Sequence, residues 1–474
     1  LGVDLQGVHI QIESKGEAAL TNGSISYDFS PLPVTYDEAA QTASAVYAQA
    51  DIPNGTYYLK IQLYGADGET LLNTITDIVK IRGYKTETTL ALDFAKLNVL
   101  YSVSYNLNGG AWADGSAESA KDRRRNAYTA ISLPEASELM RANYEFAGWL
   151  VDNASITEIG AGAATAKDYA LTAQWRLVPT LYVSASGNNE SNNGTNKADA
   201  FATISAAIDK IVALAESSKT AADWTIYIDG EVVGANDISN SLTTEHAKSL
   251  TITGAHNTNS ITGGYTDVLN GGSVYSAAGE GSATINGSVL SITTAVPVTI
   301  SNVKITNGIP TGGYGGGIQI GSGSENVTLE SGAWITDNHT YYSGGGIMLN
   351  GTLTMKAGAV ISNNSANDWG GGIWIGSNAT FIMEGGEIRD NTAGSGAAVC
   401  HSGADFRISG SARIPAGADA AHPQDLYLMS DSSNGTYPIT IAGELTANAP
   451  VATLTFGGNY SSYVDNTLLK AADG

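Results

Sequence analysis

One pattern of hydrophobic and polar positions returns four times between residues 305 and 414. In each copy a β-branched residue and polar residues lead to a glycine-rich or alanine-rich turn, and an apolar strand follows. The apolar residue after the turn is Ile318, Ile347, Ile373 and then Val399, so it recurs after 29, 26 and 26 residues. A nearly fixed period of this length is typical of a solenoid.

Each period contains three short runs in which apolar and polar residues alternate, bounded by Gly, Asn or Ser. Three strands per period predict one coil of a parallel β-helix, with coils stacked at the ~4.8 Å spacing of paired strands. Superposing the coils predicts three columns of inward side chains: Ile318, Ile347, Ile373 and Val399; Val327, Leu353, Phe381 and Phe406; Ile335, Ile361 and Ile388.

The turns of the repeat predict two further columns. Stacked glycines permit a tight turn that a Cβ atom would obstruct, and stacked asparagines predict a ladder of side-chain amides that satisfies backbone groups in the turn. The residues assigned to these structural positions, with the isoleucines between them, are Gly317, Ile318, Asn338, Gly346, Ile347, Asn364, Gly372, Ile373 and Asn391.

The alternation of GGxI turns with I/FxxN segments resembles the repeats of the chlamydial polymorphic outer membrane proteins. The similarity covers roughly a quarter of the chain. Members of that family are surface adhesins with a right-handed parallel β-helix of the pectin-lyase-like kind. The resemblance therefore implies an extracellular location on a bacterial cell surface.

A helical pattern precedes the regular coils. Ile204, Ile208 and Ile211 share one face of this segment, and Thr203 or Ser205 is the predicted N-cap. Strand, polar loop and amphipathic helix in this order resemble the entry of pectin-lyase-like β-helices, where a short helix covers the open N-terminal coil. Irregular coils follow, so the β-helix is predicted to occupy residues 177–474.

Two smaller modules are predicted before the β-helix. Short alternating strands and turns in residues 1–98 predict an immunoglobulin-like β-sandwich. In residues 99–176, the segments 101–110, 144–149 and 170–175 resemble the Listeria-Bacteroides (internalin B-type) repeat, a β-grasp-like module of secreted and cell-surface bacterial proteins. The expected fold class is thus all-β: a sandwich, a β-grasp-like repeat and a right-handed parallel β-helix with a capping helix.

Aromatic and basic residues in the second module carry further expectations. Phe146, Trp149 and Trp175 should supply the core that so small a module needs. Residues 121–125, Lys-Asp-Arg-Arg-Arg, form a basic run that we expect to be a solvated loop. The other interpretation is a site for an anion or an acidic glycan.

Charge and composition exclude some functions. Lys and Arg number 23 against 46 Asp and Glu, and a formal charge of −23 argues against nucleic acid as a partner. One cysteine, Cys400, excludes an intramolecular disulfide framework. No run of 18 apolar residues is present, so no transmembrane segment is expected in this chain. Because the chain begins with Leu1, we expect a processed protein or a fragment.

Catalytic and metal sites are weakly indicated. A polysaccharide lyase or hydrolase needs clustered carboxylates, and the best pair is Asp337 and Asp390, expected two coils and roughly 9.6 Å apart. Cys400 and His401 are predicted to point outward and inward respectively, which argues against a joint nucleophile or metal pair. No cofactor is expected, although calcium in the Asn- and Asp-rich loops stays open.

Binding residues are indicated more clearly. Gln319, Met348, Trp374 and Cys400 form one outward column, which is unusually apolar for a position that faces solvent. Aromatic residues also precede the glycine turns. These rings either stack on sugars or anchor a protein partner, or a neighbouring loop covers them. The candidate binding residues are Met348, Trp374, Tyr314, Tyr341, Tyr342 and Trp369.

Two hypotheses of function follow. The first is a non-enzymatic extracellular bacterial surface protein, an adhesin or a subunit of a surface filament. Its partner would be a host or bacterial surface protein or a glycan, and head-to-tail assembly of the chain would fit exposed strand edges. The alternative is a carbohydrate-active β-helix protein, either a polysaccharide lyase or hydrolase or a glycan-binding module.

Overall fold

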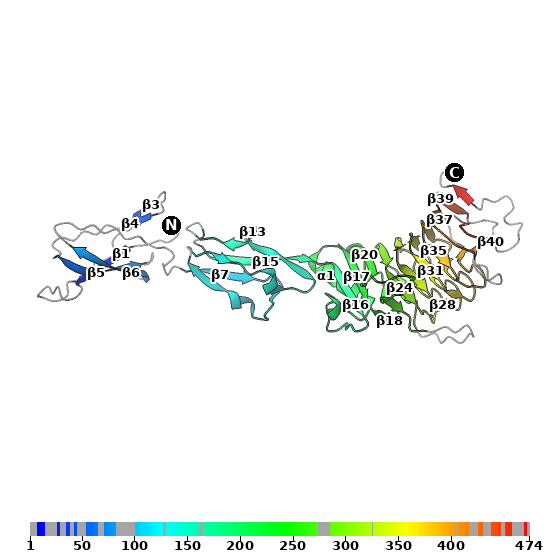
Figure 1. The fold of residues 1–474 in the computed structure, drawn as a ribbon, viewed down its shortest axis with the longest axis horizontal. Helices are drawn as coiled ribbons and strands as arrows, with labels where there is room; N and C mark the ends of the chain where they lie inside the picture. The colour runs from blue at the N-terminus through cyan, green and yellow to red at the C-terminus, as the bar shows by residue number, and fades with distance from the viewer. Residues whose placement is uncertain are drawn as a thin grey trace. The chain divides into compact units, whose positions relative to one another are not determined.

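The protein is described by a computed structural model. It covers residues 7–14, 26–28, 35–37, 42–44, 54–64, 71–81 and 100–471, with gaps at 127–128, 162–164, 166, 274–284, 325, 403–404, 417–424, 430–437, 447–450 and 457–468. The chain divides into two compact units, Leu1–Val178 and Pro179–Gly474 (Figure 1).

The first part of unit 1 is described by its backbone strands. Four of them form an antiparallel sheet in the order β2-β1-β5-β6, and β3 pairs with β4. Their bounds are β1 (Gly7–Ser14), β2 (Ser26–Asp28), β3 (Thr35–Asp37), β4 (Thr42–Ser44), β5 (Gly55–Tyr64) and β6 (Leu71–Ile81). The division of this unit into an immunoglobulin-like module and a separate repeat stays a prediction.

The second part of unit 1 is built on a five-stranded sheet in the order β13-β12-β15-β7-β9. Strands β15 and β7 are parallel, and the other neighbours are antiparallel. The elements are β7 (Leu100–Asn106), β8 (Ala111–Trp112), η2 (Glu118–Lys121), β9 (Arg123–Asn126), β10 (Ile131–Ser132), η3 (Ala136–Glu138), β11 (Leu139–Met140), β12 (Tyr144–Val151), β13 (Ala154–Ile156), β14 (Glu158–Ile159) and β15 (Tyr169–Leu177).

Aromatic rings fill the core of this sheet. Trp149 is buried as expected, with its ring 5.2 Å from that of Tyr105. Phe146 and Trp175 are partly buried and pack against the edge of the cluster. Trp112, which the sequence analysis overlooked, is fully buried. The core of this module therefore contains Trp112 in addition to the aromatic residues expected from the sequence.

The basic run corrects one expectation. Residues 123–125 belong to strand β9, which pairs with β7, and not to a loop. Asp122, Arg123 and Arg124 are exposed as expected, whereas Arg125 is only 3% exposed. The Arg125 guanidinium donates to the carbonyl oxygens of Thr129, Gly160 and Thr165. A charged side chain is buried here because several carbonyl groups satisfy it.

Unit 2 confirms the predicted parallel β-helix. Its strands form three long sheets whose neighbours are all parallel.

Sheet A contains β16 (Thr180–Ser184), β17 (Ala222–Asp229), β20 (Ala247–Gly254), β23 (Val298–Ser301), β26 (Val327–Leu329), β30 (Thr352–Met355), β34 (Thr380–Met383), β37 (Asp405–Gly410), β39 (Ile439–Leu445) and β41 (Leu469–Ala471). Sheet B contains β18 (Glu231–Val233), β21 (Val268–Asn270), β24 (Val303–Thr306), β27 (Ala333–Thr336), β31 (Val360–Ser362) and β35 (Glu387–Arg389). Sheet C contains β19 (Asn236–Ile238), β22 (Leu290–Ile292), β25 (Ile318–Ile320), β29 (Ile347–Leu349), β33 (Ile373–Ile375), β36 (Val399–His401), β38 (Leu426–Leu428) and β40 (Leu454–Phe456). The short strands β28 (His339–Thr340) and β32 (Ser365–Ala366) pair with each other in a corner.

The capping helix α1 (Ile204–Ser218) is also confirmed. Thr203 is its N-cap, since the Thr203 side chain accepts from the Ala206 N–H at 3.2 Å. The helix buries its apolar face, including Ile208 and Ile211, and it contacts β16, β17 and β19. Strands β16 and β17 are the first two of sheet A, and β19 is the first of sheet C, so the helix covers the N-terminal end of the β-helix (Figure 1).

The predicted columns form the core of unit 2. Ile318, Ile347, Ile373 and Val399 are register neighbours in sheet C, and all are fully buried. Phe381 and Phe406 stack in the second column with ring centroids 4.9 Å apart. The third column, Ile335, Ile361 and Ile388, aligns in sheet B.

The asparagines form a hydrogen-bonded ladder beside these columns. Asn338 donates its amide to the side-chain oxygen of Asn364 at 2.9 Å, and Asn364 donates in the same way to Asn391 at 3.0 Å. The three amides also donate to the backbone oxygens of Ile305, Ile335 and Ile361. The side-chain oxygens of the ladder accept from the backbone N–H groups of Gly308, Asn338 and Asn364, each in the turn of the preceding coil. Turn groups that no strand reaches are thereby satisfied.

Close packing surrounds the glycine turns. A Cβ atom on Gly345 would clash with the backbone oxygens of Ser365 and Gly371 in the next coil. Gly317, Gly346 and Gly372 each lie against a backbone oxygen of the following coil, next to an amide of the asparagine ladder. Glycine is required where two coils approach this closely.

Candidate functional site

Three exposed rings lie at the glycine turns of the β-helix. Tyr314, Tyr342 and Trp369 are 45%, 50% and 41% exposed. The backbone of Tyr314 forms a parallel β-bridge with Ser343 in the next coil, and the backbone of Ser343 forms one with Trp369 in the coil after that. The Tyr314 and Tyr342 rings stack with centroids 5.2 Å apart and planes 20° apart. We call these three residues the aromatic face.

The other predicted binding residues are less accessible. Tyr341 is half-buried, and its ring meets His339 edge-on at 5.2 Å. Met348 and Trp374 are neighbours in sheet C and are both half-buried. They are in register but contribute less open surface than the aromatic face.

Cys400 occupies the predicted outward column, in register between Trp374 and Tyr427 of the adjacent coils. It is nevertheless fully buried, so it offers no surface to solvent. Burial, with a smaller contribution from the charge of Asp425, raises the pKa of the Cys400 thiol to about 12. His401 is buried beside it and its ring lies edge-on to Phe406. The thiol is therefore a poor nucleophile.

The two candidate catalytic carboxylates occupy corners of the coil. Asp337 and Asp390 both have positive φ, 57° and 55°, as does Asn363 between them in the stack. Asn and Asp adopt this left-handed conformation more readily than other side chains. Asp337 lies 3.6 Å from Lys304, and Asp390 lies 2.5 Å from Arg389. Local backbone geometry and ion pairs thus account for both residues.

A charged cluster that the sequence analysis missed lies at the start of the β-helix. It comprises Lys197, Asp229, His256 and Asp267, which we call the Lys-Asp-His-Asp cluster. Within the described residues, Asp229, His256 and Asp267 are the one group of three side chains with potential metal-ligating atoms all within 4.8 Å of one another. Asp229 ends β17, His256 follows β20, and Asp267 immediately precedes β21.

Asp267 is the buried anchor of the cluster. Its side chain is fully buried, and its two oxygens accept four hydrogen bonds. The Gly230 N–H and the His256 Nδ1–H donate to Oδ1 at 3.0 and 2.7 Å. The His256 backbone N–H and the Asn259 amide donate to Oδ2 at 2.7 and 2.6 Å. This carboxylate has no remaining lone pair for a further partner.

The outer half of the cluster is open to solvent. The Lys197 ammonium donates to Asp229 at 2.7 Å and lies 3.4 Å from the His256 Nε2. That Nε2 lies 3.7 Å from the same Asp229 oxygen, and the His256 side chain is 36% exposed. The hydrogen bond to Asp229 raises the pKa of Lys197.

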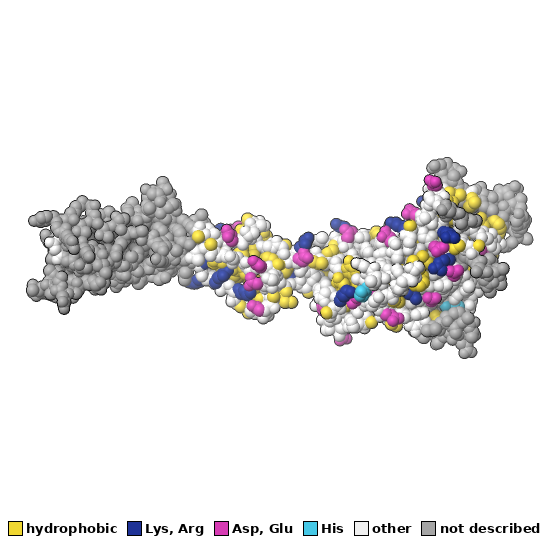
Figure 2. All heavy atoms as spheres, viewed as in Figure 1, with side chains coloured by type: hydrophobic (Ala, Val, Ile, Leu, Met, Phe, Trp, Pro, Cys, Tyr) yellow, Lys and Arg dark blue, Asp and Glu magenta, His cyan; other side chains and the backbone are white. Residues whose placement is uncertain are grey.

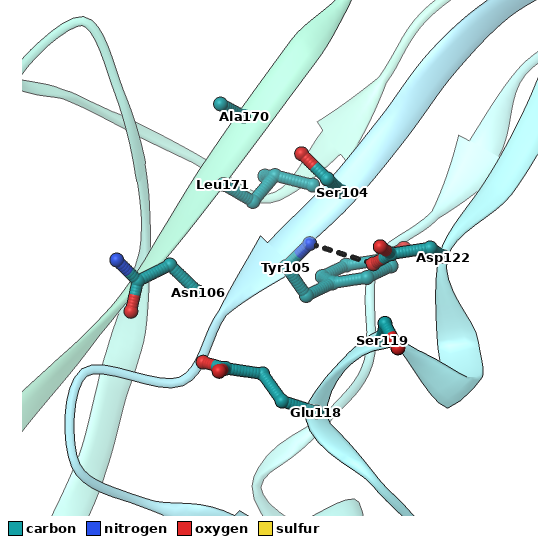
Figure 3. Close-up of a pocket in the computed structure, with 8 residues that line it drawn as sticks. All are labelled: Ser104, Tyr105, Asn106, Glu118, Ser119, Asp122, Ala170 and Leu171. Carbon is teal, nitrogen blue, oxygen red and sulfur yellow. Dashed lines mark hydrogen bonds between the residues drawn. The ribbon is translucent and has the colours of Figure 1, made fainter.

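A hollow in unit 1 holds two more carboxylates (Figure 3). It measures about 450 Å³ and lies between β7, β15 and η2. Asp122 accepts from the Tyr105 backbone N–H at 3.0 Å, and Glu118 accepts from the Leu107 N–H at 2.7 Å. Both carboxylates therefore accept from backbone N–H groups at the C-terminal end of β7, beyond the part of β7 that pairs with β9. These hydrogen bonds give both acids a structural role.

On the described part of the face shown in Figure 2, acidic and basic side chains are intermixed and do not gather in one large patch of either sign. Among the described residues, no helix combines the length and apolarity needed to cross a lipid bilayer. No family model, curated protein or solved structure matches the chain.

Proposed function

We propose that this chain is a non-enzymatic bacterial surface adhesin whose β-helix binds a glycan through the aromatic face. The observation that carries the proposal is the exposure of Tyr314, Tyr342 and Trp369 on three successive coils. Exposed rings held by paired backbone are rigid platforms for the C–H faces of sugars. The resemblance of the repeats to those of surface adhesins supports the same location and role.

The size of the aromatic face favours a glycan over a protein. A stable protein interface buries roughly 800 Å² on each partner, whereas three rings form a narrow strip. Polar groups that can bond sugar hydroxyls adjoin the strip, since Asn367 and Asp368 are exposed next to Trp369. Stacked rings beside amide and carboxylate groups match the mixed apolar and polar surface of a sugar chain.

The carbohydrate-active alternative is supported less well. Asp337 and Asp390 sit two coils apart and each is paired with a cation. Left-handed turn geometry explains why an Asp stands at both positions. A glycan that binds the aromatic face should accordingly be released unchanged.

The test is a glycan array followed by titration calorimetry with the best ligand. Wild-type protein should bind, and Trp369→Ala or Tyr342→Ala should weaken binding by roughly 2–12-fold, because each ring supplies about 0.5–1.5 kcal/mol of stacking. Tyr182→Ala is the matched control. Tyr182 belongs to another stacked tyrosine pair of the β-helix, with Tyr227 at 5.2 Å.

Two results would contradict the proposal. One is equal glycan binding by wild type, Trp369→Ala and Tyr342→Ala, which would place the ligand elsewhere. The other is the absence of glycan binding together with capture of a defined surface protein that these variants abolish. Chain shortening of a bound glycan, followed by chromatography, would instead favour the carbohydrate-active alternative.

A further inference from the structure

The Lys-Asp-His-Asp cluster contains the histidine–carboxylate hydrogen bond that is typical of histidine metal sites. In such sites one imidazole nitrogen binds the metal, and the other donates its hydrogen to a carboxylate that fixes the tautomer and the ring plane. Here the His256 Nδ1 lies 2.7 Å from Asp267, whose oxygens already accept two backbone N–H groups. The hydrogen of His256 is therefore on Nδ1, and Nε2 presents a lone pair.

The lone pair of Nε2 faces a second ligand atom. The Asp229 Oδ1 lies 3.7 Å from it, which is less than twice the usual Zn–N or Zn–O distance of about 2.0–2.2 Å. One metal ion can thus contact both atoms without moving either strand. Asp229 is fixed because it ends β17, and His256 is fixed by two bonds to Asp267.

A cation already occupies this part of the molecule. The Lys197 ammonium lies within 3.4 Å of both the Asp229 oxygen and the His256 Nε2. Its side chain is 47% exposed, so it can swing into solvent when another cation arrives. Lys197 is therefore a built-in competitor for the position between the two ligands.

We infer that His256 Nε2 and Asp229 form a binding site for a divalent transition metal of the Zn²⁺ type, with Asp267 as the positioning carboxylate and Lys197 as the displaceable occupant. Imidazole with carboxylate suits zinc better than magnesium or calcium, which prefer oxygen alone. Two protein ligands leave the other positions to water. The metal would join the first two coils, because β17 and β20 are neighbours in sheet A.

The experiment uses untagged, EDTA-treated full chain titrated with ZnCl₂ by calorimetry and followed by thermal unfolding. Wild type should take up Zn²⁺ saturably, and its melting temperature should rise with metal concentration. His256→Ala should weaken this uptake by at least tenfold. His246→Ala is the control, since His246 is half-buried and binds Thr243 outside the cluster.

Lys197→Met separates metal binding from mere folding effects. Removing the ammonium should strengthen Zn²⁺ binding several-fold, a gain that a misfolded variant cannot imitate. Asp267→Asn should weaken binding by about 10–100-fold, as loss of a supporting carboxylate does. Equal Zn²⁺ binding by wild type and His256→Ala, or weaker binding by Lys197→Met than by wild type, would overturn the inference. Neither outcome bears on glycan binding, because the aromatic face lies on later coils.

Discussion

Asn338 and Asn364 stand one coil apart and are joined twice. The Asn338 side-chain amide and the Asn338 backbone N–H both donate to the Asn364 Oδ1, at 2.9 and 3.1 Å. Both side chains are almost completely buried. Each asparagine thus links its own coil to the next one, since Asn364 is joined to Asn391 by the same two hydrogen bonds.

The central rung of this ladder should be essential for stability. Asn364→Ala leaves the Asn338 N–H and the Ile335 oxygen without their partner, and each buried orphan costs about 1–3 kcal/mol. We expect a loss of about 3 kcal/mol in the free energy of unfolding, measured by urea titration. Asn367→Ala, an exposed change in the same turn, should cost less than about 0.5 kcal/mol. Equal losses in the two variants would show that the ladder contributes little.

Coil spacing at the glycine turns gives a second prediction. Gly345→Ala places a methyl group against two backbone oxygens of the next coil and should destabilise the protein by about 3 kcal/mol. The control is Gly312→Ala, because no atom lies within 4 Å of the added carbon there. Urea titration of both variants measures the difference. If Gly345→Ala unfolds at the wild-type midpoint, the coils are less tightly apposed than described.

His339 should make stability depend on pH. Burial lowers its pKa to about 4 from an ordinary value of 6.5, so the unfolded chain takes up the proton first as the pH falls. The contribution of His339 to stability should be constant above pH 7 and should decline between pH 6.5 and pH 4 by about 3 kcal/mol. Unfolding free energies of wild type and His339→Gln across that range provide the measurement, and the difference between them should shrink on acidification. Parallel curves would refute the assignment.

Cys400 should be chemically silent in the folded protein. With a pKa of about 12 and full burial, almost no thiolate is present or accessible at pH 8. We expect Ellman's reagent to label native protein at least 100-fold more slowly than protein unfolded in guanidinium chloride. The single cysteine makes the signal unambiguous. Rapid labelling in native buffer would mean that the strand carrying Cys400 opens easily.

The repeat of the β-helix was predictable because one signal occurs several times. Ile318, Ile347 and Ile373 recur after 29 and 26 residues beside the same glycine turn, so their alignment follows from the repeated pattern, and the asparagine ladder follows from the same repeat. Thr203 as N-cap and the buried helix face also follow from local patterns. These features depend only on residues close in the sequence or at the same position in the next repeat.

Features that depend on irregular segments were missed. His256 and Asp267 meet Asp229 because a loop leaves and rejoins the coil, and no fixed spacing announces such a meeting. Arg125 was expected in solvent because charge runs usually are, but carbonyl groups far along the chain enclose it. Cys400 was placed outward by correct alternation, yet adjacent coils bury it. Composition and repeat period do not indicate which side chains will be buried by residues distant in the sequence.

Ile347 and Ile373 are equivalent positions, and this equivalence determines which insertions and deletions the β-helix can accept. Since both occupy the same position in successive coils, removing or copying the 26 residues between them rejoins the chain at a matching point. Each such event would shift everything beyond it by one strand spacing of about 4.8 Å and leave every ladder continuous. Genetic duplication of a single coil would therefore lengthen the β-helix by one strand spacing at a time while the fold stays the same.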